Sequence, residues 1–141
     1  MNNNVVPCLS PADARSYSPL ALAFVGDAVY EAFIRTKTLL EANTSAHKLH
    51  RKAVAFVRAG AQSVAIKALL PLLTAEEEEV FKRGRNAHSA SVPKNADVTE
   101  YRAATGFEAL LGYIYLLGQT DRLNFLMEEA YNAILSENQT A

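Results

Sequence analysis

The sequence predicts an all-α fold, a bundle of helices. Apolar residues recur every three or four positions in several long segments, and residues typical of helix caps precede these segments. No segment shows the sustained alternation of apolar and polar residues that is typical of a half-buried strand. A chain of 141 residues, half of them hydrophobic, is large enough for one sizeable core and predicts a single domain.

Residues 1–17 predict an irregular N-terminal arm, with one turn of helix at 11–15. The polar start lacks the basic region of a signal peptide, and no uncharged apolar run is long enough to span a membrane. We therefore expect a cytoplasmic protein with no membrane partner. Cys8 is the only cysteine, which excludes a disulfide or a cysteine metal cluster within one chain.

A first long helix is expected from about Pro19 to Leu40, with Ser18 as its N-cap. Apolar residues run almost all round it, as in a core helix, yet Gly26 and Asp27 occupy its middle. Mid-helix glycine costs about 1 kcal/mol relative to alanine, and a buried carboxylate without a partner costs more. Two explanations stay open: Gly26 permits a close helix crossing and Asp27 has a basic or hydroxyl partner, or Asp27 binds a metal ion.

A second long helix is expected from the cap cluster at 43–45 as far as Pro71. Between Ala42 and Ala75 there is no acidic residue. The net charge of the chain is −1, so any basic face must be local. Such a face favours an anionic partner, although basic residues on a helix are more often its solvated side. The five basic residues of this stretch are Lys48, Arg51, Lys52, Arg58 and Lys67.

A capping box, Thr74 with Glu77, predicts a shorter helix from Ala75 to Gly84 or beyond. The glutamates at 76–79 suit the positive end of the helix dipole, and we assign them no chemistry. Residues 83–96 then lack an apolar period and predict a loop rich in small, polar and basic residues. Loops of this length in compact domains are usually functional or disordered.

Asp97 is expected to cap a further helix, which ends at Gly118 and carries Glu108 in an apolar setting close to Gly112. A last amphipathic helix is expected from Asp121 to about Leu135, followed by a flexible tail at 137–141. If the two glycine-bearing helices cross closely, Asp27 and Glu108 face each other. They would repel unless a cation lay between them, and Mg²⁺ suits such a site because it takes oxygen ligands and few carboxylates.

Two segments resemble the ribonuclease III family. Residues Phe24-Val25-Gly26-Asp27-Ala28-Val29 resemble its signature helix, and residues 107–116 (FEALLGYIYL) resemble its second catalytic helix. Residues 82–87 (KRGRNA), 92–96 (VPKNA) and Tyr101-Arg102 resemble the Mini-ribonuclease III branch, which has the catalytic domain alone. The resemblance runs from Leu20 to the end of the last helix.

The resemblance implies a homodimeric catalytic domain at residues 18–136, with the helix at 24–30 in the dimer interface. It implies a metal-dependent endoribonuclease that cleaves double-stranded RNA, leaves 5′-phosphate and 3′-hydroxyl ends, and matures the large-subunit ribosomal RNA precursor. Asp27 and Glu108 would be the catalytic and metal-binding residues, with Mg²⁺ as cofactor and Mn²⁺ as a substitute. No DNA partner is expected. The alternative is a catalytically weak or inert RNA-binding or ribosome-assembly dimer.

A protein that recognises the shape of an RNA duplex needs hydrogen-bond donors for phosphates and 2′-hydroxyls. Long members of the family carry two further acids, at the positions of Ala23 and Thr105 here. The Thr105 hydroxyl could still hold a metal-bound water, and Glu31 could be a further ligand or an i,i+4 partner of Arg35. The three histidines, His47, His50 and His88, match no catalytic signature and are expected at the surface. The residues expected to bind RNA are Arg83, Arg85, Asn86, Lys94 and Asn95.

Overall fold

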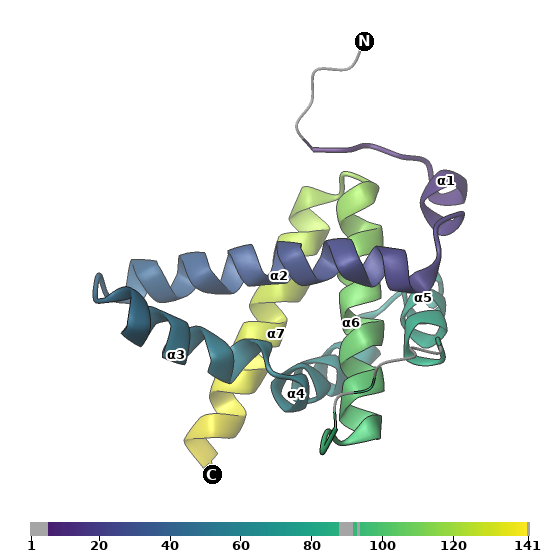
Figure 1. The fold of residues 1–141 in the computed structure, drawn as a ribbon. Coiled ribbons are helices and arrows are strands. Elements are labelled where there is room, and N and C mark those ends of the chain that lie inside the picture. The colour runs from purple at the N-terminus through teal and green to yellow at the C-terminus, as the bar shows by residue number, and fades with distance from the viewer. Residues whose placement is uncertain (1–5, 88–91, 93, 141) are drawn as a thin grey trace.

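The computed structural model describes residues 6–87, 92 and 94–140. The described part of the chain is helical and contains no strand, which confirms the all-α prediction (Figure 1). Its elements are α1 (Pro11–Arg15), α2 (Pro19–Glu41), α3 (Ala46–Val57), α4 (Ala59–Leu69), the 3₁₀ segment η1 (Leu70–Leu72), α5 (Ala75–Arg85), α6 (Val98–Leu116) and α7 (Thr120–Thr140).

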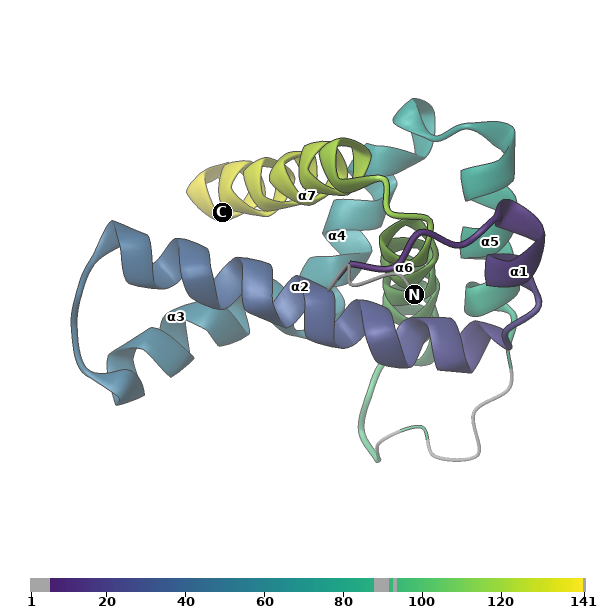
Figure 2. The same cartoon turned by 90° about the horizontal axis from the view of Figure 1, so that it is seen from above.

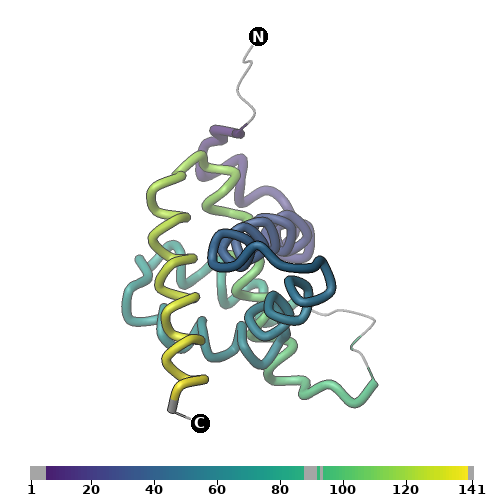
Figure 3. Tube along the Cα trace, turned by 90° about the vertical axis from the view of Figure 1, so that its left-hand side faces the viewer, coloured from purple at the N-terminus to yellow at the C-terminus, as the bar shows by residue number. Residues whose placement is uncertain are grey.

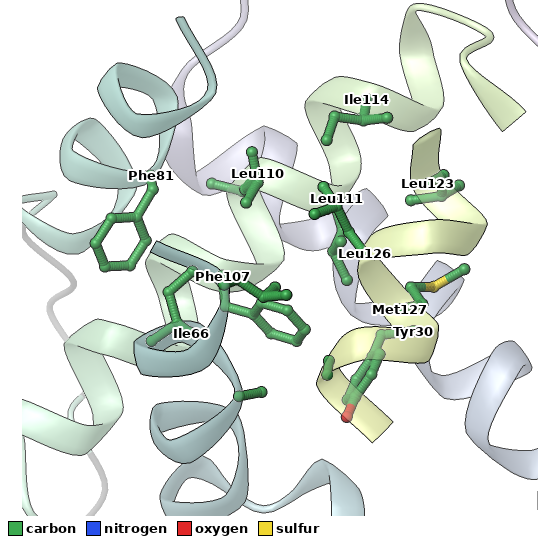
Figure 4. Packing of buried hydrophobic residues seen from close by; sticks show 14 of the residues in the cluster. Tyr30, Ile66, Phe81, Phe107, Leu110, Leu111, Ile114, Leu123, Leu126 and Met127 are labelled. Atoms are coloured by element: carbon green, nitrogen blue, oxygen red, sulfur yellow. The ribbon is translucent and has the colours of Figure 1, made fainter. Parts of the chain in front are cut away.

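Helix α6 is the centre of the fold. Helices α2, α4, α5 and α7 all pack against it, and α2 crosses it near its middle (Figures 1 and 2). Its residues from Ala109 to Ile114 are all buried, as is Phe107. The ring of Tyr30 from α2 meets the ring of Phe107 edge to face, with centroids 5.0 Å apart. Figure 4 shows these residues beside others from α4, α5 and α7, namely Ile66, Phe81, Leu123, Leu126 and Met127.

Helix α2 is not fully buried within the chain, although apolar residues run almost all round it. Its buried residues occupy one face, whereas Phe24 is 81% exposed and Ala28 and Ala32 are also exposed. Helix α3 covers part of the C-terminal half of α2 (Figures 2 and 3). No described residue covers the Phe24 side, so burial within the chain does not explain these apolar residues. The buried residues are Leu22, Ala23, Gly26, Tyr30, Ile34 and Thr38.

The segment expected as one helix from 45 to 71 is divided at Arg58. This residue has an extended backbone (φ −61°, ψ 153°), and the helical axes on its two sides differ in direction by 48°. Arg58 is neither glycine nor proline, so no local sequence signal marks the break. Two side chains satisfy carbonyls released at the end of α3: Tyr30 Oη donates to Phe56 O over 3.1 Å, and Gln62 Nε2 donates to Val57 O over 2.8 Å.

The helix starts agree with the predicted caps. Each cap side chain accepts a hydrogen bond from the backbone N–H three residues later, and the capping box of Thr74 and Glu77 is complete. Glu77 also accepts two hydrogen bonds from Arg122 of α7, over 2.7 and 2.9 Å. Glu77 therefore links α5 to α7, in addition to the favourable interaction of the glutamates with the positive end of the helix dipole. The other caps are Ser18, Ser45 and Asp97.

Both ends of the described chain hold more regular structure than expected. Helix α1 is the single turn predicted within the arm, and Leu9 N donates to Leu116 O over 2.8 Å, which ties the arm to the end of α6. Helix α7 continues to Thr140 instead of ending near Leu135, through most of the predicted tail. No glycine or proline follows Leu135, so nothing in the sequence forces the helix to stop there.

Among the described residues, no single helix is long and apolar enough to cross a membrane. Helix α3 together with the α4–η1 segment reaches that length and composition only as a bent pair.

Candidate active site

The site begins with a contact between two glycines. Gly26 of α2 lies against α6 at Glu108 and Gly112, so that a Cβ on Gly26 would overlap the Glu108 carbonyl. A Cβ on Gly112 would likewise overlap the Leu22 carbonyl of α2. Only glycine allows two helix backbones to approach this closely. The predicted close crossing of the two glycine-bearing helices is therefore confirmed.

This crossing brings Asp27 and Glu108 together. Asp27 follows Gly26 and is exposed, whereas Glu108 is half-buried. Burial and the nearby Asp27 carboxylate, with which Glu108 can share a proton in a hydrogen bond, raise the pKa of Glu108 to about 8. In the described part of the chain neither acid forms an ion pair with a basic residue. The structure thus gives no support to the alternative of a basic partner for Asp27.

Gln62 of α4 is the neutral neighbour of the pair. Its Nε2 donates to Glu108 Oε2 over 3.4 Å and to Val57 O over 2.8 Å. This hydrogen bond lowers the pKa of Glu108, against the larger raising effects of burial and Asp27. The other amide atom, Gln62 Oε1, is buried and has no hydrogen-bond partner among the described residues. The site therefore holds two carboxylates and one unpaired buried acceptor.

These donors fit a hard divalent cation. Mg²⁺ prefers oxygen ligands, often takes only one or two carboxylates from the protein, and keeps several waters. Two carboxylates that repel each other without a basic neighbour would be stabilised by such an ion. The described residues include no group of three or more His, Cys, Asp or Glu side chains arranged to hold a metal. Asp27 and Glu108 would supply the carboxylate oxygens for such an ion, and water would complete its coordination.

The residues predicted to contact RNA lie at the two ends of the segment between α5 and α6. Arg83 and Arg85 belong to the last turn of α5, not to the loop, and Arg85 Nε donates to Asn86 Oδ1 over 3.2 Å. Lys94 and Asn95 are exposed, and Asn95 has a φ of 72°, which asparagine tolerates better than most residues. Residues 88–91 and 93 of the predicted loop lie outside the described residues.

A second close contact joins the C-terminal end of α5 to α6. Gly84 packs against α6, and a Cβ on it would lie 2.9 Å from Gly106 Cα and 2.8 Å from Ala109 Cβ. These two positions flank Glu108 on the same turn of α6. The structure therefore packs the backbone of α5 at Gly84, between Arg83 and Arg85, against the turn of α6 that contains Glu108.

The basic residues of α3 are exposed, as expected for a solvated or anion-binding face. Lys48, Arg51 and Lys52 form no ion pair with any residue that the structure describes. His47 and His50 are exposed on the same helix, which confirms their predicted place at the surface. His88 lies outside the described residues.

Comparison with known proteins identifies the family of this chain. A family model described as the Ribonuclease III domain matches residues 20–119, a range that includes both acids and both glycine contacts. The chain belongs to the ribonuclease III family. This confirms the resemblance that the motifs predicted.

Relatives within the ribonuclease III family match over most of their length. The Mini-ribonuclease 3 of a Thermoanaerobacter species is 47% identical over 119 residues, 84% of each chain. That of Symbiobacterium thermophilum is 46% identical, covering 87% of this chain and 95% of the relative. That of Enterococcus faecalis is 45% identical, covering 90% and 98%. A crystal structure of a Fusobacterium nucleatum protein matches with a TM-score of 0.76 and 32% identity, covering 85% of this chain and 96% of that one.

Two positions differ from the acids of long ribonuclease III proteins. Ala23 is buried, and Thr105 Oγ1 donates to Tyr101 O over 3.1 Å, which leaves the hydroxyl oxygen able to accept another hydrogen bond. Glu31 pairs with Arg35 over 3.0 Å, so the predicted i,i+4 pair is confirmed. Glu31 is also close enough to add to the raised pKa of Glu108. Water binding by Thr105 and metal binding by Glu31 remain predictions.

Sequence reasoning missed Gln62. The one signal was a polar side chain among small and apolar residues, just after Gly60. That pattern cannot show which side chain the amide meets, because the contact joins residues 46 positions apart. The break at Arg58, which begins α4 and directs Gln62 toward Glu108, was not predicted either.

Proposed function

We propose that this chain hydrolyses double-stranded RNA at the Asp27–Glu108 pair, with Mg²⁺ as its cofactor and Mn²⁺ as a substitute. Membership of the ribonuclease III family makes it an endoribonuclease for double-stranded RNA. The observation that carries the catalytic assignment is the pair itself: two neighbouring carboxylates, without a basic partner in the described chain, at a glycine-built crossing.

Each acid has a distinct part in this proposal. Asp27 is exposed, so a phosphate of a long duplex can reach it, whereas Glu108 is held half-buried on the central helix. Both carboxylates would hold the cation, and Glu108 must release a proton for this. A bound Mg²⁺ ion lowers the pKa of a coordinated water and offsets the charge that develops on the phosphate. No protein nucleophile is needed, and the products are 5′-phosphate and 3′-hydroxyl ends.

Substrate contact is assigned to the two ends of the α5–α6 segment. Arg83 and Arg85 supply charged donors in the last turn of α5, and Lys94 supplies another just before α6. Such donors recognise phosphates and 2′-hydroxyls without reading base sequence. Duplex RNA is therefore the expected partner and DNA is not. The two amides of the set, Asn86 and Asn95, would add hydrogen bonds to the same backbone.

A homodimer would use the exposed apolar face of α2. Phe24, Val25, Ala28 and Val29 line a depression of about 600 Å³, with Asp27 at its border. A large side chain that is 81% exposed favours a protein partner, and a two-fold axis would present two acid pairs to the two strands of a duplex. The proposed domain at residues 18–136 would act in the cytoplasm on the large-subunit ribosomal RNA precursor.

Incubation of pure protein with a duplex RNA, with Mg²⁺ and with EDTA, tests the proposal. Metal-dependent shortening to fragments with 5′-phosphate ends supports it. A duplex that is bound but stays intact supports the alternative, an RNA-binding or ribosome-assembly dimer, for which the loss of acids at Ala23 and Thr105 is the motivating observation. Asp27→Asn is the control for a contaminating nuclease, because cleavage by a contaminant would survive it.

A further inference from the structure

Gln62 is an almost fully buried amide at the edge of the acid pair. Its side chain is 3% exposed, and its Nε2 donates to Val57 O over 2.8 Å and to Glu108 Oε2 over 3.4 Å. Val57 O is a carbonyl oxygen and can only accept, so the amide nitrogen must face it and the amide cannot be turned the other way round. The position of Oε1 follows from this, because it is bonded to the same carbon.

Gln62 Oε1 is the one buried side-chain N or O atom without a hydrogen-bond partner in the part of the chain that the structure describes. A buried acceptor that lacks a donor is costly, and native proteins seldom keep one without a reason. Methionine would fill nearly the same volume without an unpaired oxygen. If the amide were needed only to satisfy Val57 O at the end of α3, its second polar atom would remain unexplained.

We infer that Gln62 is a positioning residue of the active site, which holds the Glu108 carboxylate toward Asp27 through Nε2 and accepts a hydrogen bond from a water at the acid pair through Oε1. This inference rests on the proposed function. Residues that hydrogen-bond to metal-binding carboxylates orient them, and a buried water needs two or more polar partners. Glu108 and the Gln62 amide are both available as partners.

The first test substitutes Gln62→Met and measures binding of Mg²⁺, and of Mn²⁺, without RNA by calorimetry and by thermal melting. The affinity for metal should fall about 10- to 100-fold, the usual effect of losing such a partner. The kcat for duplex cleavage should fall while KM for the duplex stays the same, because the RNA contacts are elsewhere. An unchanged metal affinity together with an unchanged kcat would overturn the inference, even if the variant melts at a lower temperature in EDTA.

Because Gln62→Met also removes the donor to Val57 O, a second variant guards against simple misfolding. Gln62→Glu keeps the shape but places a third carboxylate beside the pair. It should melt at a lower temperature than the wild type in EDTA and gain more from Mg²⁺, because the cation relieves the added repulsion. An Mg²⁺ shift equal to that of the wild type would contradict the inference.

Ser63→Ala is the matched control. Ser63 is the next residue of α4, it is also buried, and it forms no hydrogen bond with Asp27 or Glu108 within the described chain. Its Mg²⁺ response should equal that of the wild type. The metal titration of the wild type distinguishes a failure of the proposed function from a failure of this inference alone. A wild type that binds no metal refutes the proposed function and this inference with it, whereas a wild type that binds metal, next to a Gln62→Met variant that binds it equally well, refutes the inference alone.

Discussion

Gly26 of α2 and Gly112 of α6 lie backbone to backbone: a Cβ on Gly26 would be 2.9 Å from Gly112 N, and a Cβ on Gly112 would be 3.1 Å from Gly26 N. The atoms in the way belong to the main chain and cannot turn aside. Gly26→Ala should therefore lower the free energy of unfolding by about 1 to 3 kcal/mol, as overpacking does, and should reduce cleavage by separating the acids. Denaturant unfolding and a cleavage assay measure the two effects.

Gly60→Ala is the control for this substitution. A Cβ at Gly60 meets chiefly the guanidinium of Arg58, the mobile end of an exposed side chain. Alanine in the first turn of α4 should leave stability unchanged or raise it by up to about 1 kcal/mol. Equal losses of stability in Gly26→Ala and Gly60→Ala would mean that the backbones at the α2–α6 crossing are no more closely packed than the surroundings of Gly60.

Asp27→Asn and Glu108→Gln should each abolish cleavage and leave duplex affinity nearly unchanged, because the basic residues hold the RNA. In metal-free buffer each variant replaces an acid whose ionisation is opposed by its neighbour with an uncharged amide, so stability should be unchanged or higher. Breaking a buried carboxylate–cation pair would instead cost about 3 to 5 kcal/mol. Thermal melting in EDTA separates these outcomes, and Mg²⁺ should raise the melting temperature of the wild type most. Large losses in EDTA combined with surviving cleavage would return both acids to a structural role.

Arg83→Ala and Lys94→Ala should weaken duplex binding and reduce the slope of log affinity against log salt by roughly one unit each. Lys67→Ala is the comparison, since Lys67 is an exposed lysine of α4 that we place outside the RNA contact. Binding isotherms at several salt concentrations give the slope. If all three variants keep the wild-type slope while remaining helical by circular dichroism, the ends of the α5–α6 segment do not contact the phosphates.

Phe24→Glu should convert the proposed dimer to a monomer. The substitution places a charge in the lining of the apolar depression on α2, which a dimer would have to bury. Leu40→Glu on the same helix is the matched control, because Leu40 is 80% exposed but lies outside that depression. Light scattering at micromolar concentration measures the mass. A monomeric wild type, or equal effects of the two variants, would rule out this interface.

Glu77→Gln should destabilise the protein in a pH-dependent way. Burial alone would raise the pKa of Glu77, but hydrogen bonds from Arg122 and Thr74 outweigh it and lower the pKa. A lowered folded-state pKa stabilises the protein above the unfolded value and loses that effect as pH falls through the folded value. The variant should therefore lose about 1.5 to 3 kcal/mol at neutral pH, the range for hydrogen bonds to charged groups. The difference should begin to shrink as pH falls below about 4.3, the value for unfolded glutamate, and the two proteins should converge only below the lowered folded-state pKa.

Glu78→Gln is the reference for the measurement on Glu77. Glu78 forms an exposed i,i+4 pair with Lys82 over 3.2 Å, and such pairs contribute only about 0.3 to 0.5 kcal/mol. Urea unfolding between pH 3 and 8 compares the two variants. A flat difference between wild type and Glu77→Gln over this range would contradict the assigned pairing with Arg122.

Local signals were enough to predict most helix starts and the acid pair. The cap side chains of Ser18, Thr74 and Asp97 each accept a hydrogen bond from the backbone N–H three residues later. Such caps can therefore be predicted from short segments of sequence. Gly26 and Gly112 were informative for a related reason, since a glycine in the middle of an apolar helix is costly unless another backbone lies against it.

Features that depend on distant partners were missed. Arg58 breaks a helix because Tyr30 and Gln62 supply donors to the carbonyls of α3, and neither partner is visible in the local pattern. The exposure of Phe24 agrees with the expectation that the helix at 24–30 has a face outside the core of its own chain, although hydrophobicity alone does not show which of its apolar residues form that face.

The contact of Gly84 with Gly106 fixes the distance between the end of α5 and the turn of α6 that carries Glu108. Helix α5 ends in cations and α6 carries Glu108, and the two helices pack closely where Gly84 meets Gly106, with the Phe81 ring against Gly106. In the proposed reaction, the packing of α5 against α6 therefore sets a distance along the RNA. This is the distance between the phosphate that the end of α5 binds and the phosphodiester bond that is cleaved. Any side chain at position 84 or 106 would push α5 and α6 apart. The cleavage position should then move along the duplex or become imprecise before RNA binding is lost.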